Sequence, residues 1–97
     1  MNGTTMDKDG LSKIFKALGH PTRIKILEHL LEKDSCFCGQ IVDIFPFSQS
    51  TISQHLKLLK ESGIVNGNIE GPATCYCVDK RVLKEFKDYV SQLNAEV

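Results

Sequence analysis

The chain has 97 residues, the length of one domain, because a second hydrophobic core would need roughly 50 residues of its own. Hydrophobic residues at 41% and charged residues at 25% are typical of a folded globular protein, which excludes a disordered tail or a fibre. Twelve Lys and Arg balance twelve Asp and Glu, so the composition lacks the basic surplus common in nucleic-acid-binding proteins. No apolar run approaches the ~20 residues of a membrane span and the polar start is not a signal peptide, so we expect a cytoplasmic protein without a membrane partner.

Two amphipathic helices are predicted in the first third of the chain. Residues 1–9 show no periodicity and predict a mobile arm. From Leu11 to Leu18, apolar residues recur with the helical spacing i, i+3, i+4 and i+7, and Gly19 ends this helix. Pro21 suits the first turn of a second helix, whose many apolar residues predict a broad buried face.

A helix-turn-helix unit is predicted over residues 38–62. Apolar residues between Ile41 and Phe45 predict its short first helix, which ends there because the residue before Pro46 disfavours helical backbone. Ser48 is a residue type that caps helix N-termini, and we expect the second helix of the unit to begin there.

The last third of the chain predicts a β-hairpin, or wing, followed by one helix. Two short runs rich in β-forming residues flank a Gly-Pro tip over residues 64–78. Residues 79–96 predict a helix with a narrow apolar seam resembling two heptad layers. The expected fold is therefore mainly α with a β-hairpin, in the order α-α-(β)-α-α-β-β-α. Residues 1–97 would form a single winged helix-turn-helix domain.

The two terminal helices predict a homodimer. We expect that a domain this small cannot bury both apolar stripes against its own core, so a second copy of the chain would cover the surplus. The expected interface residues are Leu11, Ile14, Phe15, Leu83, Phe86, Val90 and Leu93.

The helix after Ser48 has the residue pattern of a DNA-reading helix. Ile52, Leu56 and Leu59 form an apolar inner stripe, whereas the other positions carry short polar side chains that suit base edges and phosphates. An ordinary solvated face would carry more Glu and Lys. We therefore expect double-stranded DNA as the partner, with the lysines facing phosphates. The expected contacts are Ser48, Gln49, Ser50, Thr51, Ser53, Gln54, His55, Lys57 and Lys60.

Four cysteines form two Cys-x-Cys pairs, which we expect to be reduced in a cytosolic chain. The segment 35–37 predicts a brief strand that pairs with the second wing strand, so that the thiols converge on one site for zinc, cadmium or trivalent arsenic. Separate half-sites, cysteine oxidation without metal and simple structural burial remain alternatives. The candidate ligands are Cys36, Cys38, Cys75 and Cys77.

Two segments resemble the ArsR/SmtB family of winged-helix repressors. Residues 17–27, Ala-Leu-Gly-His-Pro-Thr-Arg-Ile-Lys-Ile-Leu, are similar to a characteristic family segment, and residues 47–65 are similar to its recognition helix and the exit from it. The resemblance implies a homodimeric repressor that leaves its operator when an inducer binds, usually a metal ion or metalloid. It also relates the pair Cys36 and Cys38 to the Cys-x-Cys pair of metalloid-sensing members.

Three functions remain open at the level of the sequence. The first is a repressor released from its operator by a thiol-binding metal or metalloid. The second is a thiol redox or reactive-sulfur response on the same scaffold, and the third is an interaction module that does not bind DNA. An enzyme is not expected, because the sequence has neither a Cys-x-x-Cys motif nor a Gly-rich phosphate loop. We also expect His20 to cap the second helix and His29 to lie on that helix's solvent side.

Overall fold

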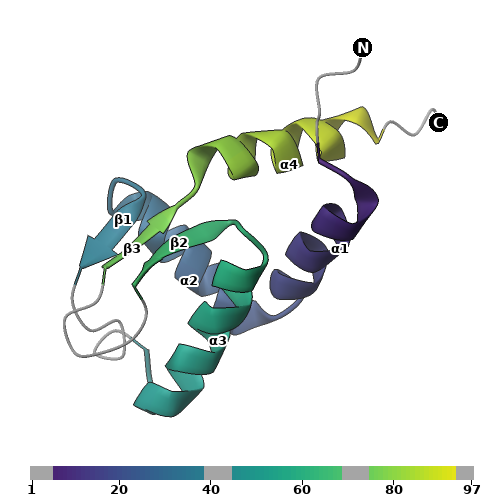
Figure 1. Cartoon of the computed structure of the whole chain (residues 1–97). Coiled ribbons are helices and arrows are strands. Elements are labelled where there is room, and N and C mark those ends of the chain that lie inside the picture. The colour runs from purple at the N-terminus through teal and green to yellow at the C-terminus, as the bar shows by residue number, and fades with distance from the viewer. Residues whose placement is uncertain (1–5, 39–44, 69–74, 94–97) are drawn as a thin grey trace.

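The computed structural model describes residues 6–38, 45–68 and 75–93. Its order of elements matches the predicted winged helix-turn-helix layout, and Figure 1 shows α4 along one side of the molecule and α3 on the opposite side. The elements are α1 (Lys8–Ala17), α2 (Pro21–Glu32), β1 (Cys36–Cys38), α3 (Gln49–Glu61), β2 (Val65–Asn68), β3 (Cys75–Val78) and α4 (Lys80–Gln92). Most of the expected short helix and the tip of the wing lie outside the described residues.

Helix α1 begins earlier than its apolar periodicity predicts. The Asp7 carboxylate accepts a hydrogen bond from the backbone N–H of Gly10 at 2.7 Å and so caps the helix N-terminus. The expectation of a mobile arm over residues 1–9 is therefore wrong at its C-terminal end, since the capping residue precedes the first apolar position by one turn. Residues 1–5 lie outside the described part of the chain.

Helix α2 begins at a histidine cap, as predicted. Nδ1 of His20 accepts a hydrogen bond from the backbone N–H of Thr22 at 3.1 Å. Ile26 and Leu30 are fully buried, but Ile24 and Leu31 are exposed, so the buried face is narrower than expected. Neighbouring elements therefore cover one side of this helix and leave its other apolar residues uncovered.

The three strands form one antiparallel sheet in the order β1-β3-β2. The expected brief strand is confirmed as β1, one residue further along the chain than the predicted 35–37, and it pairs with the second wing strand. Tyr76 and Val78 of β3 point into the core, so Cys75 and Cys77, which alternate with them, lie on the outer face. The sheet thus sets the position of the cysteines while its inner face closes the core.

The end of the sheet is tied to the start of α4. Asp79 caps this helix by accepting hydrogen bonds from the backbone N–H groups of Arg81 and Val82, each at 3.1 Å, and its second carboxylate oxygen accepts one from Nδ2 of Asn66 at 3.0 Å. The bond from the Val82 N–H, then that from Asn66, lowers the pKa of Asp79. The direction of α4 is therefore fixed by the wing.

The core lies between α1, α2, α3 and the inner face of the sheet. Helix α4 has no buried residue, although Val82, Leu83 and Phe86 pack partly against the core. In the part of the chain that the structure describes, no helix is both long enough and apolar enough to cross a membrane. The core residues are Ile14, Ala17, Ile26, Leu27, Leu30, Ile52, Leu56, Leu59, Ile64, Val65, Tyr76 and Val78.

Candidate functional site

Helix α3 buries one apolar face and presents a mainly polar outer face. Ile52, Leu56 and Leu59 are buried, as predicted. Ser48 caps the helix: its Oγ accepts a hydrogen bond from the Thr51 backbone N–H at 3.3 Å and donates one to Thr51 Oγ1 at 3.0 Å. The first turn is thus fixed by its own hydroxyl groups and leaves other backbone N–H groups directed outward.

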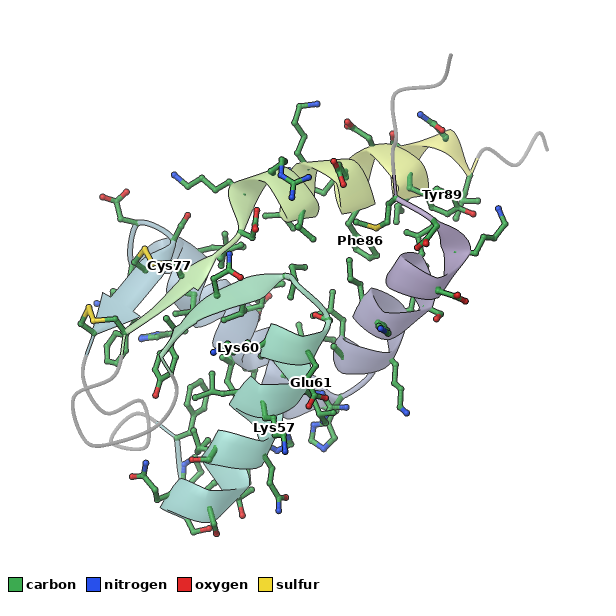
Figure 2. All side chains as sticks on the ribbon, in the orientation of Figure 1. Lys57, Lys60, Glu61, Cys77, Phe86 and Tyr89 are labelled. Carbon is green, nitrogen blue, oxygen red and sulfur yellow. A yellow bond between two sulfur atoms is a disulfide. The ribbon has the colours of Figure 1, made fainter. Side chains whose placement is uncertain are left out.

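The structure gathers the expected DNA-contacting residues along this one helix. Leu58, an apolar residue of the same helix, lies among the exposed residues. Figure 2 shows Lys57 and Lys60 on successive turns of α3. The half-buried members of the set are Thr51, Ser53 and His55. The exposed members are Ser48, Gln49, Ser50, Gln54, Lys57 and Lys60.

His55 is packed against the beginning of α2. Its ring centroid lies 4.7 Å from that of His20 and 6.5 Å from that of Phe47. Nη1 of Arg23 lies 3.3 Å from Nδ1 of His55. Burial, and then the positive fields of His20 and Arg23, lower the pKa of His55, which favours the neutral ring.

Arg23 connects three helices and is a site residue that the sequence does not reveal by its spacing. Nε of this α2 residue donates to the carbonyl of Ala17 at 2.6 Å and Nη2 donates to that of Lys16 at 3.4 Å, both in the last turn of α1. Its contact with His55 spans 32 residues of sequence. The only signal in the sequence is its place in the segment 17–27 that resembles the family.

The four cysteines meet in pairs across β1 and β3. Cys36 stands opposite Cys77, and Cys38 stands opposite Cys75. Each pair is bonded as a disulfide, so the expectation of four reduced thiols is wrong for this structure. The physical reason is the register: directly opposed residues on antiparallel strands are close enough for a disulfide to form.

The disulfides limit what the cysteines can bind in this state. A disulfide sulfur is not a thiolate, and the thiolate is the form that ligates metals. Within the described ranges, no group of three or more His, Cys, Asp or Glu side chains is arranged to hold a metal ion. The cysteines lie on the outer face of the sheet, where Figure 2 labels Cys77. Reduction would therefore leave four thiols on this one face.

The apolar surface at the terminal helices is smaller than expected. Leu11 and Ile14 are buried within the subunit, so the expectation that these two residues lie at a dimer interface is wrong. Phe15 remains 47% exposed, and on α4 Val90 is 40% and Leu93 62% exposed. The remaining expected interface residues, Leu83 and Phe86, are half-buried.

His29 does not lie on the solvent side of α2, so that expectation is wrong. Its ring packs against Phe37 and Phe45, with centroids 5.5 Å and 6.3 Å away. Its Nε2 is buried and has no hydrogen-bond partner among the described residues. The aromatic side chains of β1 and of the segment before α3 cover this side of the helix.

Comparison with known proteins agrees with these observations. The profile of the family described as bacterial regulatory protein, arsR family, matches residues 20–67. An HTH-type transcriptional regulator of Methanocaldococcus jannaschii is 46% identical over 83 residues, which are 84% of this chain and 92% of that protein. The chain belongs to the arsR family.

Members of the arsR family are transcriptional regulators and not enzymes. The arsenical resistance operon repressor of Staphylococcus xylosus is 35% identical over 82 residues, covering 84% of this chain and 74% of that one. The solved structure of an ArsR-like transcriptional regulator from Rhodococcus sp. RHA1 superposes with a TM-score of 0.70 at 23% identity, over 88% of this chain and 79% of that one. This likeness confirms the winged helix-turn-helix fold.

Proposed function

We propose that the protein is a cytoplasmic, homodimeric repressor that binds a specific double-stranded DNA operator through α3. The observation that carries this proposal is the division of α3 into a buried apolar face and an exposed face of Ser, Gln and Lys side chains. The N-terminal half of such a helix fits the major groove, where short polar side chains reach base edges.

The side chains of α3 divide into two kinds of contact. Gln49 and Gln54 are exposed amides, and an amide can bond an adenine edge through two hydrogen bonds. Lys57 and Lys60 are exposed cations that suit phosphates. The outward N–H groups at the Ser48 end add a phosphate contact favoured by the helix dipole.

A second copy of the chain would cover the exposed apolar surface of α1 and α4. Phe15, Val90 and Leu93 would lie in a self-complementary interface around a two-fold axis. Such a dimer would present two α3 helices to successive turns of DNA, about 34 Å apart. Dimerisation would therefore raise the affinity for DNA, which the zero net charge of a single chain does not favour.

Fluorescence anisotropy against the DNA upstream of the protein's own gene tests this function. We expect salt-sensitive binding that unlabelled copies of the same DNA displace far better than unrelated DNA. Absence of binding in both the oxidised and the reduced protein would contradict the proposal. That result would favour an interaction module that does not bind DNA.

For the inducer, we propose that the four cysteines on the sheet are the sensor. In the reduced protein, opposed thiols have Cβ atoms about 5 Å apart, and the two pairs lie about 7 Å apart along the strands. Three or four of these sulfurs can then reach one ion with bonds of about 2.3 Å. Zinc, cadmium and trivalent arsenic suit such sulfur ligands. The similarity to an arsenical resistance operon repressor supports this class of inducer.

The disulfides favour a second form of the same proposal, a redox response without metal. Reduction of each disulfide consumes two electrons and two protons from two cellular thiols, which become a disulfide, and yields two cysteine thiols. Cys38–Cys75 and Cys36–Cys77 join β1, which precedes the helix-turn-helix unit, to β3 of the wing. Breaking both would release this connection and change the position of the wing relative to α3.

Metal analysis of the anaerobically reduced protein separates the two forms. Zinc, cadmium and arsenite are offered in turn to the wild type, to Cys36→Ser and to Cys75→Ser, which remove one thiol from different opposed pairs. Loss of binding in both variants supports one shared site, whereas loss in only one contradicts it. If the metal-free protein instead loses DNA affinity on a change of redox state alone, the redox form is correct. The coupling typical of allostery predicts a change of about 5- to 150-fold.

A further inference from the structure

We propose that Arg23 is a positioning residue for DNA recognition, which donates to Nδ1 of His55 and so leaves Nε2–H as the donor that this ring offers to DNA. The inference rests on the proposed DNA-binding function. Arg23 belongs to α2 and not to α3, the helix proposed to contact DNA bases. Its basis is the set of contacts made by one guanidinium group.

The guanidinium of Arg23 is held in position by contacts other than the one with His55. Two of its donors are directed to the carbonyl groups of Ala17 and Lys16, at 2.6 Å and 3.4 Å. These carbonyls are in the last turn of α1, at the negative end of the helix dipole, which attracts a cation. The side chain of Arg23 is therefore held in one place, with Nη1 directed to His55.

The contact with Nη1 determines which ring nitrogen of His55 carries the proton. A guanidinium has only donors, so Nδ1 of His55, 3.3 Å away, must be the acceptor. The neutral ring then carries its proton on Nε2. No residue in the described ranges makes a hydrogen bond to this atom, so Nε2–H is left for an acceptor on DNA.

The charges around the ring of His55 also favour its neutral form. The described charged or titratable groups facing His55 are His20 and Arg23, both at the beginning of α2, while α1 contributes only the two carbonyls bound by Arg23. Burial and these two groups lower the pKa of His55. A protonated ring would also place an N–H at Nδ1 against the guanidinium and break the contact. At neutral pH the ring is therefore a neutral donor in a fixed orientation.

Nitrogen-15 NMR of the histidine side chains tests the first half of the inference without DNA. In the wild type, His55 should show an unprotonated Nδ1, a protonated Nε2 and a pKa below its ordinary value of 6.5. Arg23→Met should give a mixture of tautomers and a higher pKa. Lys25→Met, an exposed charge loss on the same helix, should leave His55 unchanged. A wild-type His55 with its proton on Nδ1 would overturn the inference.

DNA affinity tests the second half. Arg23→Met and His55→Gln should each weaken binding about tenfold, the value of one charge-assisted hydrogen bond. The double variant should be no weaker than either single one, because both remove the same contact. Losses that multiply in the double variant would show that Arg23 does not act through His55 and would overturn the inference.

The pH profile of binding is a readout that general loss of structure would not produce. Wild-type affinity should change little between about pH 6 and about pH 8, where an unperturbed histidine titrates. Arg23→Met should bind more tightly as the pH falls, because its His55 gains a positive charge, and His55→Gln should abolish this slope. Equal profiles in wild type and Arg23→Met would contradict the inference.

Two further results keep the inference distinct from the proposed function. If Arg23→Met does not fold, Arg23→Lys replaces it; Lys keeps the charge but cannot bond both α1 and His55, so affinity should fall while the pH profile stays flat. Unchanged affinity in that variant would overturn the inference.

If the wild type binds no DNA although His55 has the expected tautomer, the proposed function is wrong, and His55 then has no role in DNA binding. If the wild type binds DNA and Arg23→Met binds equally well, only the inference fails.

Discussion

The rings of Phe15 and Phe86 meet edge to face with their centroids 5.2 Å apart, and this contact joins α1 to α4. Such aromatic pairs contribute about 0.5–1.5 kcal/mol beyond the burial of their area. The rest of the apolar seam of α4 has little to cover it in one subunit, since Val90 and Leu93 are exposed. Phe15 of α1 and Val90 and Leu93 of α4 are therefore the exposed apolar residues that the proposed dimer would cover.

Val90→Glu should convert the protein to monomers, because a buried carboxylate without a partner is costly in a dimer but harmless on an exposed monomer surface. Light scattering measures the mass. Lys87→Glu, an exposed change of charge on the same helix, should remain dimeric. A fully dimeric Val90→Glu would show that the interface lies elsewhere.

Lys57→Ala should weaken binding to all DNA sequences about equally and reduce the salt slope by about 1, since one phosphate contact is lost. Anisotropy titrations at several salt concentrations give the slope. Lys87→Ala removes an equal charge from α4, far along the chain from α3, and should leave the slope unchanged. If both variants behaved alike, Lys57 would contribute only to net charge.

Reduction of the two disulfides should lower the free energy of unfolding by about 2–4 kcal/mol, because they join residues 41 and 37 apart in sequence and restrict the unfolded chain. The second disulfide should add less than the first, since its loop lies inside the other. Thermal denaturation with and without a thiol reductant measures the change. A variant with all four cysteines replaced by Ser should not respond to the reductant.

Asp79→Ala should lower the free energy of unfolding by about 1 kcal/mol at neutral pH, the usual value of a helix cap. The lowered pKa of Asp79 means that its contribution is present above the ordinary value of 3.8 and is lost as the pH falls through the lowered one. The difference between wild type and variant should therefore disappear in acid. Asp88→Ala, which removes a surface pair with Lys84, should change stability little.

The sequence predicted what depends on local pattern. The Ser48 cap and the inner stripe of α3 follow from residue types at fixed spacing, and both are confirmed. The pairing of β1 with β3 was also predictable, because both strands are short β-forming segments in an order common to winged helices. The two disulfides could not be predicted in the same way, since they depend on the register that places each cysteine of β1 directly opposite one of β3.

Contacts between distant residues escaped prediction for a different reason. The bond from Arg23 to His55 requires the packing of α2 against α3, which no spacing along the chain encodes. His29 was placed in solvent because helical periodicity gives no account of Phe37, which approaches from β1. Tertiary contacts of this kind decided where the functional side chains lie within a correctly predicted fold.

If α3 reads a DNA sequence, Gln54→Ala should reduce the preference of the protein for that sequence. Affinities for the upstream DNA and for unrelated DNA of equal length are measured at one salt concentration for wild type and variant. The variant should lose about 1–3 kcal/mol of discrimination, the value of one bidentate amide contact to a base, while its affinity for unrelated DNA is unchanged. An equal loss of affinity for both DNAs, or no loss for either, would show that α3 does not read the sequence through Gln54.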